Sequence, residues 1–82
     1  MPIARKTYSE EEREFVKNIG FRIQFFRKKA RLSQYQLAES AELSETTIGH
    51  LESQASYGLS VVALFRIAKA LQVGPDQLLK FD

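Results

Sequence analysis

Residues 32–52 have the sequence LSQYQLAESAELSETTIGHLE, and this stretch decides the fold. Ser33 and Ser44 each stand directly before residues whose apolar members recur three and four positions apart, which predicts two short helices with serine N-caps. Only about three residues separate these helices, so they must cross steeply. The stretch therefore predicts a helix-turn-helix over residues 34–51.

The apolar residues of this stretch predict which side of each helix is buried. Ala38 is expected at the closest approach of the two helices, where a small side chain is needed. Leu43, Ile48 and Leu51 are expected to fill the space beneath the crossing. With these residues inward, the second helix turns a different set outward. The outward residues are Glu45, Thr46, Gly49 and His50.

Further helices are predicted on both sides of this unit. Ser9 precedes three glutamates in a capping pattern that begins a long first helix, which ends near Ala30. Ser60 is the expected N-cap of a fourth helix, and Pro75 stands at the first position of a fifth. The inward face of the first helix is predicted to contain Phe15, Ile19, Ile23, Phe26 and Ala30. The inward face of the fourth is predicted to contain Val61, Leu64, Ile67, Ala68 and Leu71.

The pattern as a whole predicts an all-α fold, because no segment favours a strand. The expected architecture is a five-helix bundle with a central helix-turn-helix and an extended first helix. Residues 1–8 are expected to form a flexible amino-terminal arm. Residues 9–82 are expected to form one domain, since 82 residues provide for a single hydrophobic core.

The composition excludes several classes of function. The chain has no cysteine and a single histidine, His50, so we expect no metal site and no cofactor. No serine or carboxylate pair stands in a catalytic pattern, and we expect no enzyme activity. Neither a signal-like apolar segment nor a run of eighteen apolar residues is present, which favours a cytoplasmic protein without a membrane partner.

Charge is unevenly distributed along the chain. Residues 1–31 contain nine Lys and Arg against four Glu, whereas residues 32–82 contain three against six Asp and Glu. The amino-terminal part is therefore expected to supply long-range attraction to polyanions. Residues 32–65 contain no Lys or Arg. This absence is unfavourable for binding a polyanion through the helix-turn-helix alone.

The stretch 32–52, with IGFRIQFFRKKARLSQ before it and LSVVALFRIAKALQVGPDQLL after it, resembles the phage repressor and Cro-like (XRE-type) helix-turn-helix family. The resemblance covers about residues 19–79. It implies a lambda-repressor-like domain that binds double-stranded DNA as a homodimer. The implied function is a sequence-specific transcriptional regulator, a repressor or autoregulator, acting on a palindromic operator.

The same resemblance implies roles for individual residues. Residues expected to face DNA bases are Glu45, Thr46, Gly49 and His50. Residues expected to contact phosphates are Gln34, Ser44 and Thr47. Arg22 and Lys28 are added as phosphate contacts because they are available cations along the end of the first helix. In this family an arginine matching Arg27 can pair with the glutamate matching Glu52. The turn position that the family usually fills with glycine is Glu42 here, and a left-handed conformation costs more without glycine.

The apolar surface leaves a second hypothesis open, an antitoxin-like or other protein-interaction module in which DNA binding is secondary or lost. The acidic recognition helix and the surplus phenylalanines favour it. An exposed apolar patch would also serve as the seam of a homodimer. The candidate seam residues are Phe25, Phe65, Leu79 and Phe81. The extended first helix is an alternative seam.

Overall fold

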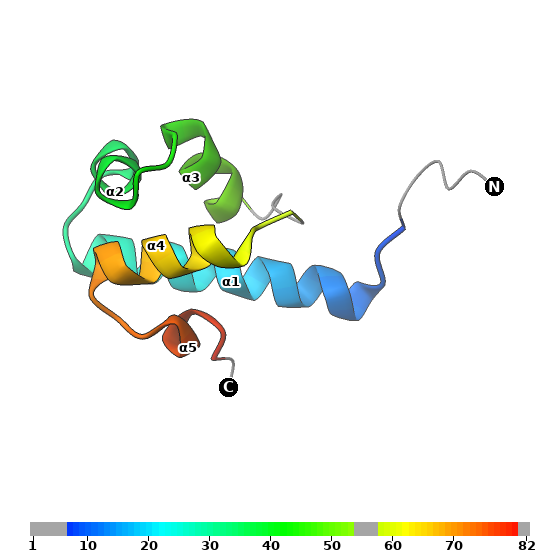
Figure 1. Ribbon diagram of the computed structural model, residues 1–82. Coiled ribbons are helices and arrows are strands. Elements are labelled where there is room, and N and C mark those ends of the chain that lie inside the picture. The colour runs from blue at the N-terminus through cyan, green and yellow to red at the C-terminus, as the bar shows by residue number, and fades with distance from the viewer. Residues whose placement is uncertain (1–6, 54–57, 81–82) are drawn as a thin grey trace.

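The computed structural model describes residues 7–53 and 58–80, and every regular element within these ranges is a helix (Figure 1). The helices are α1 (Glu10–Lys29), α2 (Gln34–Ala41), α3 (Glu45–Glu52), α4 (Val61–Leu71) and α5 (Pro75–Leu78). The predicted all-α fold with an extended first helix is therefore confirmed. Of the predicted arm, only Thr7 and Tyr8 lie in the described part, so the division into arm and domain stays a prediction.

The predicted serine caps are all present. Ser9 and Ser33 form complete capping boxes with Glu12 and Gln36. The hydroxyl groups of Ser44 and Ser60 each accept a backbone N–H three residues on, at 3.0 Å. Each cap satisfies a donor that the first helical turn would otherwise leave free. These local bonds fix where four of the helices begin.

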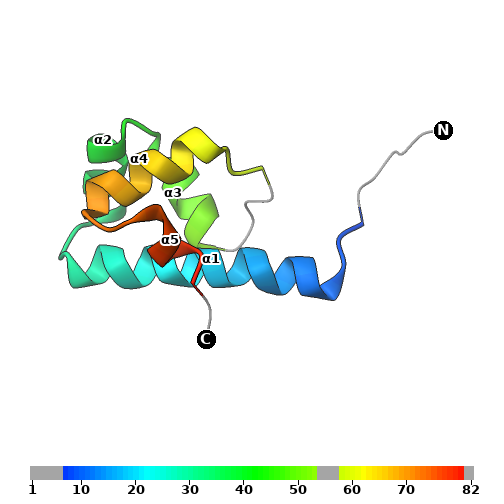
Figure 2. The same ribbon diagram turned by 60° about the horizontal axis from the view of Figure 1, so that its bottom comes forward.

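The other helices pack around α1, which is the longest element (Figure 1). α2 and α3 lie together on one side, α4 crosses beside them, and α5 lies beyond α4 (Figures 1 and 2). The amino-terminal half of α1 extends past the rest of the bundle in both views. Within the described ranges no helix combines the length and the apolar character needed to span a membrane.

The core lies where α1, α2, α3 and α4 meet. Ile23, Leu37, Ile48 and Ile67 are fully buried there, and so is Leu78 of α5, a helix that contacts α1 and α4. The complete set of buried apolar residues is Ile19, Ile23, Leu37, Ala38, Ala41, Ile48, Leu51, Ile67, Ala68, Leu71 and Leu78. Phe26, Leu43 and Leu64 pack against it while partly exposed. The predicted inner side of the helix-turn-helix is thus confirmed.

Three predictions of inward residues are wrong. Phe15 is 48% exposed, Val61 is 81% exposed and Ala30 is also exposed. Phe15 lies on the part of α1 that extends past the bundle, and the other two stand at helix ends. A periodic pattern gives the direction of a side chain, but it does not show whether another helix lies opposite.

α1 and α3 approach each other most closely at Gly20. A Cβ added at this glycine would lie 2.5 Å from the carbonyl oxygen of Leu51, which is backbone and cannot move aside cheaply. Only a residue without a side chain allows this approach. Gly20 therefore sets the distance between the long helix and the helix-turn-helix.

The turn between α2 and α3 adopts the expected left-handed conformation at Glu42, with φ 59° and ψ 43°. The N–H of Leu43 donates to the carbonyl of Ala38 at 2.9 Å, which closes the helix end as in a Schellman motif. Arg31 and Gln72 close α1 and α4 with the same handedness. All three positions bear the strain of a side chain in a conformation that favours glycine.

Candidate nucleic-acid interface

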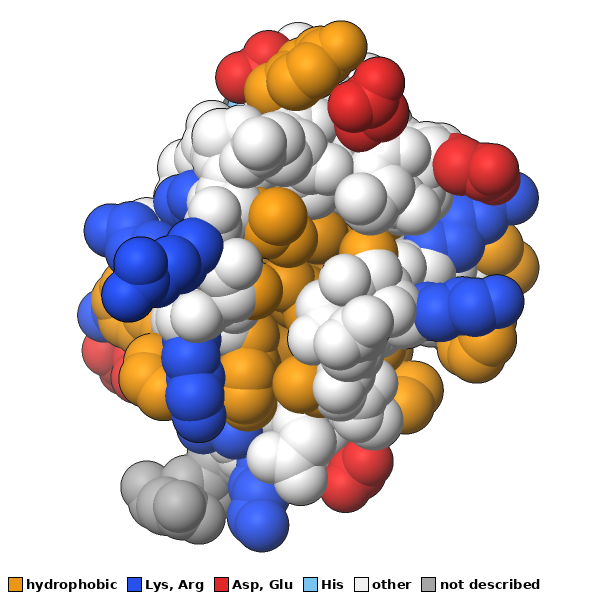
Figure 3. Space-filling view, turned by 90° about the vertical axis from the view of Figure 1, so that its left-hand side faces the viewer, with side chains coloured by type: hydrophobic (Ala, Val, Ile, Leu, Met, Phe, Trp, Pro, Cys, Tyr) orange, Lys and Arg blue, Asp and Glu red, His pale blue; other side chains and the backbone are white. Residues whose placement is uncertain are grey.

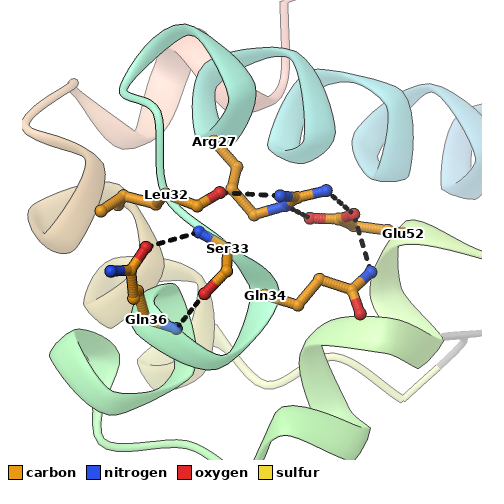
Figure 4. A network of polar contacts seen from close by, with 6 residues as sticks. All are labelled: Arg27, Leu32, Ser33, Gln34, Gln36 and Glu52. Atoms are coloured by element: carbon orange, nitrogen blue, oxygen red, sulfur yellow. Dashed lines mark hydrogen bonds and ion pairs between the residues drawn. The ribbon is translucent and has the colours of Figure 1, made fainter.

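A buried ion pair joins the helix-turn-helix to α1 (Figure 4). Arg27 Nε donates to Glu52 Oε2 at 2.6 Å, and a second guanidinium nitrogen donates to Glu52 Oε1 at 3.0 Å. A third nitrogen of Arg27 donates to the carbonyl of Leu32 at 2.8 Å. The family-like pairing of Arg27 with Glu52 is therefore confirmed, and Arg27 has a structural role. Its charge is neutralised inside the protein and is not available to a phosphate.

Gln34 extends this network from α2 to α3. Its Nε2 donates to Glu52 Oε1 at 3.1 Å (Figure 4). Its carbonyl oxygen lies over Gly49, 3.7 Å from where a Cβ would stand. Gln34 thus supports α3, as the resemblance implied. The second hydrogen of its amide nitrogen is the donor that a phosphate contact would use.

The outer side of α3 has the orientation that the sequence predicts. Glu45, Thr46 and His50 are exposed, and Gly49 is half-buried beside Gln34. Gly49 has no side-chain group that could contact a base, but it leaves space for a ligand to approach α3 closely. The residues that can contact a base edge chemically are the other three. Glu45 can accept from cytosine N4, Thr46 can contact either a polar edge or the thymine methyl, and His50 can donate or accept.

Ser44 and Thr47 lie together at the amino end of α3. Their hydroxyl oxygens are 2.8 Å apart, and Ser44 Oγ also accepts the N–H of Thr47. The N–H groups of a helix amino terminus attract anions. The structure thus brings two of the predicted phosphate contacts to one point, next to the predicted base-contacting residues.

The two basic residues predicted to contact phosphate are not part of this cluster. Arg22 Nε donates to the carbonyl of Gln77 at 2.8 Å, and its guanidinium lies 5.2 Å from the centre of the Phe26 ring. Arg22 is therefore engaged at the junction of α1 and α5. Lys28 borders a hollow on α1 together with Phe21 and Phe25. The structure brings neither residue together with the outer side of α3.

Acidic side chains mark the end of the molecule that α2 and the following turn form. Glu39, Glu42 and Glu45 are all exposed. Figure 3 shows red carboxylates at the top of the face, toward α2 and α3, with blue basic groups along its flanks. This distribution weakens the long-range attraction of the α2–α3 surface for DNA. Any electrostatic attraction for DNA has to come from the cations that flank this surface.

Residues 58–60, directly before α4, lie beside α3, which the sequence did not indicate. Thr47, His50 and Leu51 share a hollow with Gly58, Leu59, Ser60 and Ala63. A ligand group against His50 therefore also meets the start of α4. No pattern in the sequence indicates this contact, because the loop has no periodicity. Residues 54–57 lie outside the described residues.

Three of the four candidate seam residues lie in the described part of the chain, and all three are exposed. Phe25 and Phe65 are each 55% exposed and Leu79 is 39% exposed. Phe25 borders the hollow on α1, whereas Phe65 borders another between α2 and α4. Phe81 lies outside the described residues. Phe25 and Phe65 therefore border different hollows.

Two short helices held at a steep crossing, with a polar outer side on the second, define the helix-turn-helix class of domain. The family model described as helix-turn-helix matches residues 23–78, and the chain belongs to this family. The expected resemblance to the phage repressor and Cro-like type is thereby confirmed. Among the described residues no group of His, Asp and Glu is placed to hold a metal ion.

Solved structures of regulators have the same fold. The chain is 28% identical to the restriction-modification controller protein C.AhdI from Aeromonas hydrophila, with a TM-score of 0.73 over 77% of this chain and 94% of that one. It is 34% identical to the DNA-binding domain of the P22 c2 repressor, with a TM-score of 0.71 over 78% and 83%. A hypothetical transcription factor, NHTF from Neisseria, is 22% identical and shares the fold, with a TM-score of 0.78 over 95% and 88%. A comparison with curated proteins finds no match.

Proposed function

We propose that this protein is a sequence-specific transcriptional regulator that binds a palindromic operator as a homodimer and acts as a repressor or autoregulator. The observation that carries the proposal is the outer side of α3, where Glu45, Thr46 and His50 are exposed while the inner side is fixed in the core. The similarity to the P22 c2 DNA-binding domain supports it.

In the proposed complex α3 enters the major groove and its exposed side chains contact base edges. Ser44 and Thr47, at the amino end of the helix, contact one phosphate, and the amide of Gln34, beside Gly49, contacts another. Arg27 and Glu52 hold α3 against α1, so the recognition helix enters as a rigid body. None of the three base-contacting residues makes the strong fork of Arg on guanine. Specificity then draws in part on DNA shape.

Cations outside the helix-turn-helix supply the attraction that α2 and α3 lack. Lys28, Lys29 and Arg31 at the end of α1 are exposed. Arg5 and Lys6 in the amino-terminal segment add two more charges, although these residues lie outside the described residues. Lys28 borders a hollow formed by α1 residues alone, which supports a contribution through the field of the whole protein.

The test selects bound sequences from random duplex DNA with the full chain and then measures affinity against salt. The expected result is a palindrome whose half-sites lie about one helical turn apart. The logarithm of affinity should fall with the logarithm of salt, by about 0.9 for each phosphate contacted. Glu39→Gln, which removes a charge on α2 off the recognition helix, should raise affinity for all sequences alike. Absence of both enrichment and salt dependence would overturn the proposal.

A protein-interaction module is the second candidate function. Phe21, Phe25 and Phe65 are each exposed by 44% or more, which is unusual for side chains of this size, and they favour a protein partner. The exposed carboxylates of Glu39, Glu42 and Glu45, on α2, the turn and the start of α3, also favour it. A chain that returns no sequence from the selection but remains folded would support this function instead.

A further inference from the structure

The outer side of α1 carries a regular stripe that the helix-turn-helix does not use. Its members recur alternately three and four residues apart, which is the spacing of a coiled-coil seam. They are Glu11, Glu14, Asn18, Phe21, Phe25 and Lys28. None of them belongs to the buried core, and all but the half-buried Asn18 are exposed. The long helix thus presents one face to the bundle and a second patterned face away from it.

The middle of this stripe is apolar and hollowed. Phe21 and Phe25 are 44% and 55% exposed, and with Gln24, Lys28 and Lys29 they border a hollow on the surface of α1. The ring of Phe25 rests edge-on against Phe26 at 5.1 Å between centres, and Phe26 packs on the core. Aromatic rings held in place beside a hollow are typical anchors of protein interfaces.

The charges at the two ends of α1 indicate which partner fits. Glu10, Glu11 and Glu14 make the amino end acidic, and Lys28, Lys29 and Arg31 make the carboxyl end basic, all of them exposed. Two copies of α1 laid antiparallel place each acidic end toward the other copy's basic end. A parallel pair would bring like charges together. The stripe is therefore complementary to itself in the antiparallel orientation.

We propose that α1 is the homodimer seam: two copies pair antiparallel through Phe21 and Phe25, with Glu14 of each copy toward Lys28 of the other. This inference rests on the proposed function, because it names the seam of the proposed homodimer. Twenty residues give α1 a length of about 30 Å, enough for a helix-pair interface. The hollow beside Phe21 and Phe25 is bordered by α1 alone, whereas the hollow beside His50 is bordered by α3 and the start of α4. Pairing through the stripe therefore leaves the recognition helix uncovered.

The first experiment compares Phe25→Ser with Phe65→Ser in the full chain. The two phenylalanines are equally exposed, at 55%, but Phe65 lies on α4. Sedimentation equilibrium should give a dimer for the parent chain and for Phe65→Ser. Phe25→Ser should weaken the dimer by on the order of tenfold or more. Because both sites are exposed, the circular dichroism spectrum of each variant should stay helical, which separates loss of pairing from loss of fold. Loss of the dimer should lower the melting temperature of Phe25→Ser only at concentrations where the parent chain is paired.

The second experiment tests the orientation through charge. Lys28→Glu with Lys29→Glu places acidic groups at both ends of α1 and should give a monomer. Adding Glu11→Lys and Glu14→Lys to that variant restores complementarity and should restore the dimer. A parallel seam would not be rescued, since like charges would again face each other.

The outcomes separate the seam from the function. A dimer that Phe25→Ser weakens and the charge exchange rescues supports the seam, even if random duplexes yield no selected sequence and the proposed function fails. A parent chain that is monomeric at all concentrations, or a dimer lost on Phe65→Ser and retained on Phe25→Ser, overturns the seam. A palindrome selected by a chain whose dimer depends on Phe65 would still support the proposed function.

Discussion

The inner and outer sides of α3 differ in what holds their residues in place. On the inner side Ile48 and Leu51 are in the core and Glu52 is bonded to Arg27 and Gln34. On the outer side Thr46 and His50 are exposed, and no bond within the described residues orients their side chains. Packing therefore constrains one side of this helix, and only a ligand can constrain the other.

The largest effect is expected from Glu52→Ala on the inner side. It leaves the Arg27 guanidinium buried without its anion, and the free energy of unfolding should fall by about 3–5 kcal/mol. Urea denaturation of the two chains measures the difference. The double variant Arg27→Met with Glu52→Leu is the control and should recover most of the loss, because it leaves no unpaired buried charge. A single variant as stable as the parent would show that the pair does not hold α3.

Gly20→Ala tests the contact between α1 and α3. The added methyl meets the carbonyl oxygen of Leu51, and the helices must separate, which should cost about 1–3 kcal/mol of unfolding free energy. Gly58→Ala is the matched control, since nothing lies within 4 Å of its added Cβ. Its effect should stay within about 0.5 kcal/mol. Equal effects at the two glycines would contradict the close approach.

The smallest effect is expected at the turn. Glu42→Gly removes left-handed strain of about 1–2 kcal/mol from the folded state. Glycine also stabilises the unfolded state by about 0.4–1 kcal/mol, because it gives that state more conformational entropy. The free energy of unfolding should therefore rise by about 0.5–1 kcal/mol. Glu39→Gly, which removes the same charge from the interior of α2, should instead destabilise by about 1 kcal/mol. Thermal melts of both variants show whether each substitution raises or lowers the stability. A loss on Glu42→Gly would contradict the strain.

Sequence reasoning succeeded where the signal is local. Ser33 with Gln36, and Ser44 before α3, identify helix starts because a cap and its partner lie within one turn. The pairing of Arg27 with Glu52 was predicted from the family resemblance, since the periodicity of the sequence does not indicate it. Phe15 was predicted inward because its spacing fits, although no core lies beside it.

The missed features depend on how elements meet. Gly20 has no sequence signal, since its role appears only once α1 crosses α3 at Leu51. The engagement of Arg22 with Gln77 joins residues 55 apart in the chain. The outer side of α3 was predicted by elimination, as the residues that do not pack. That reasoning gives the orientation of His50 and says nothing about which base it contacts.

The central claim is that the outer side of α3 determines specificity and not stability, and His50→Ala tests it most directly. The measurement is the selected sequence profile and the free energy of unfolding of this variant beside those of the parent chain. The predicted result is unchanged stability with a preference relaxed at one position of each half-site, by about 1–3 kcal/mol. Uniform weakening at every position, or a profile identical to the parent's, would contradict the claim.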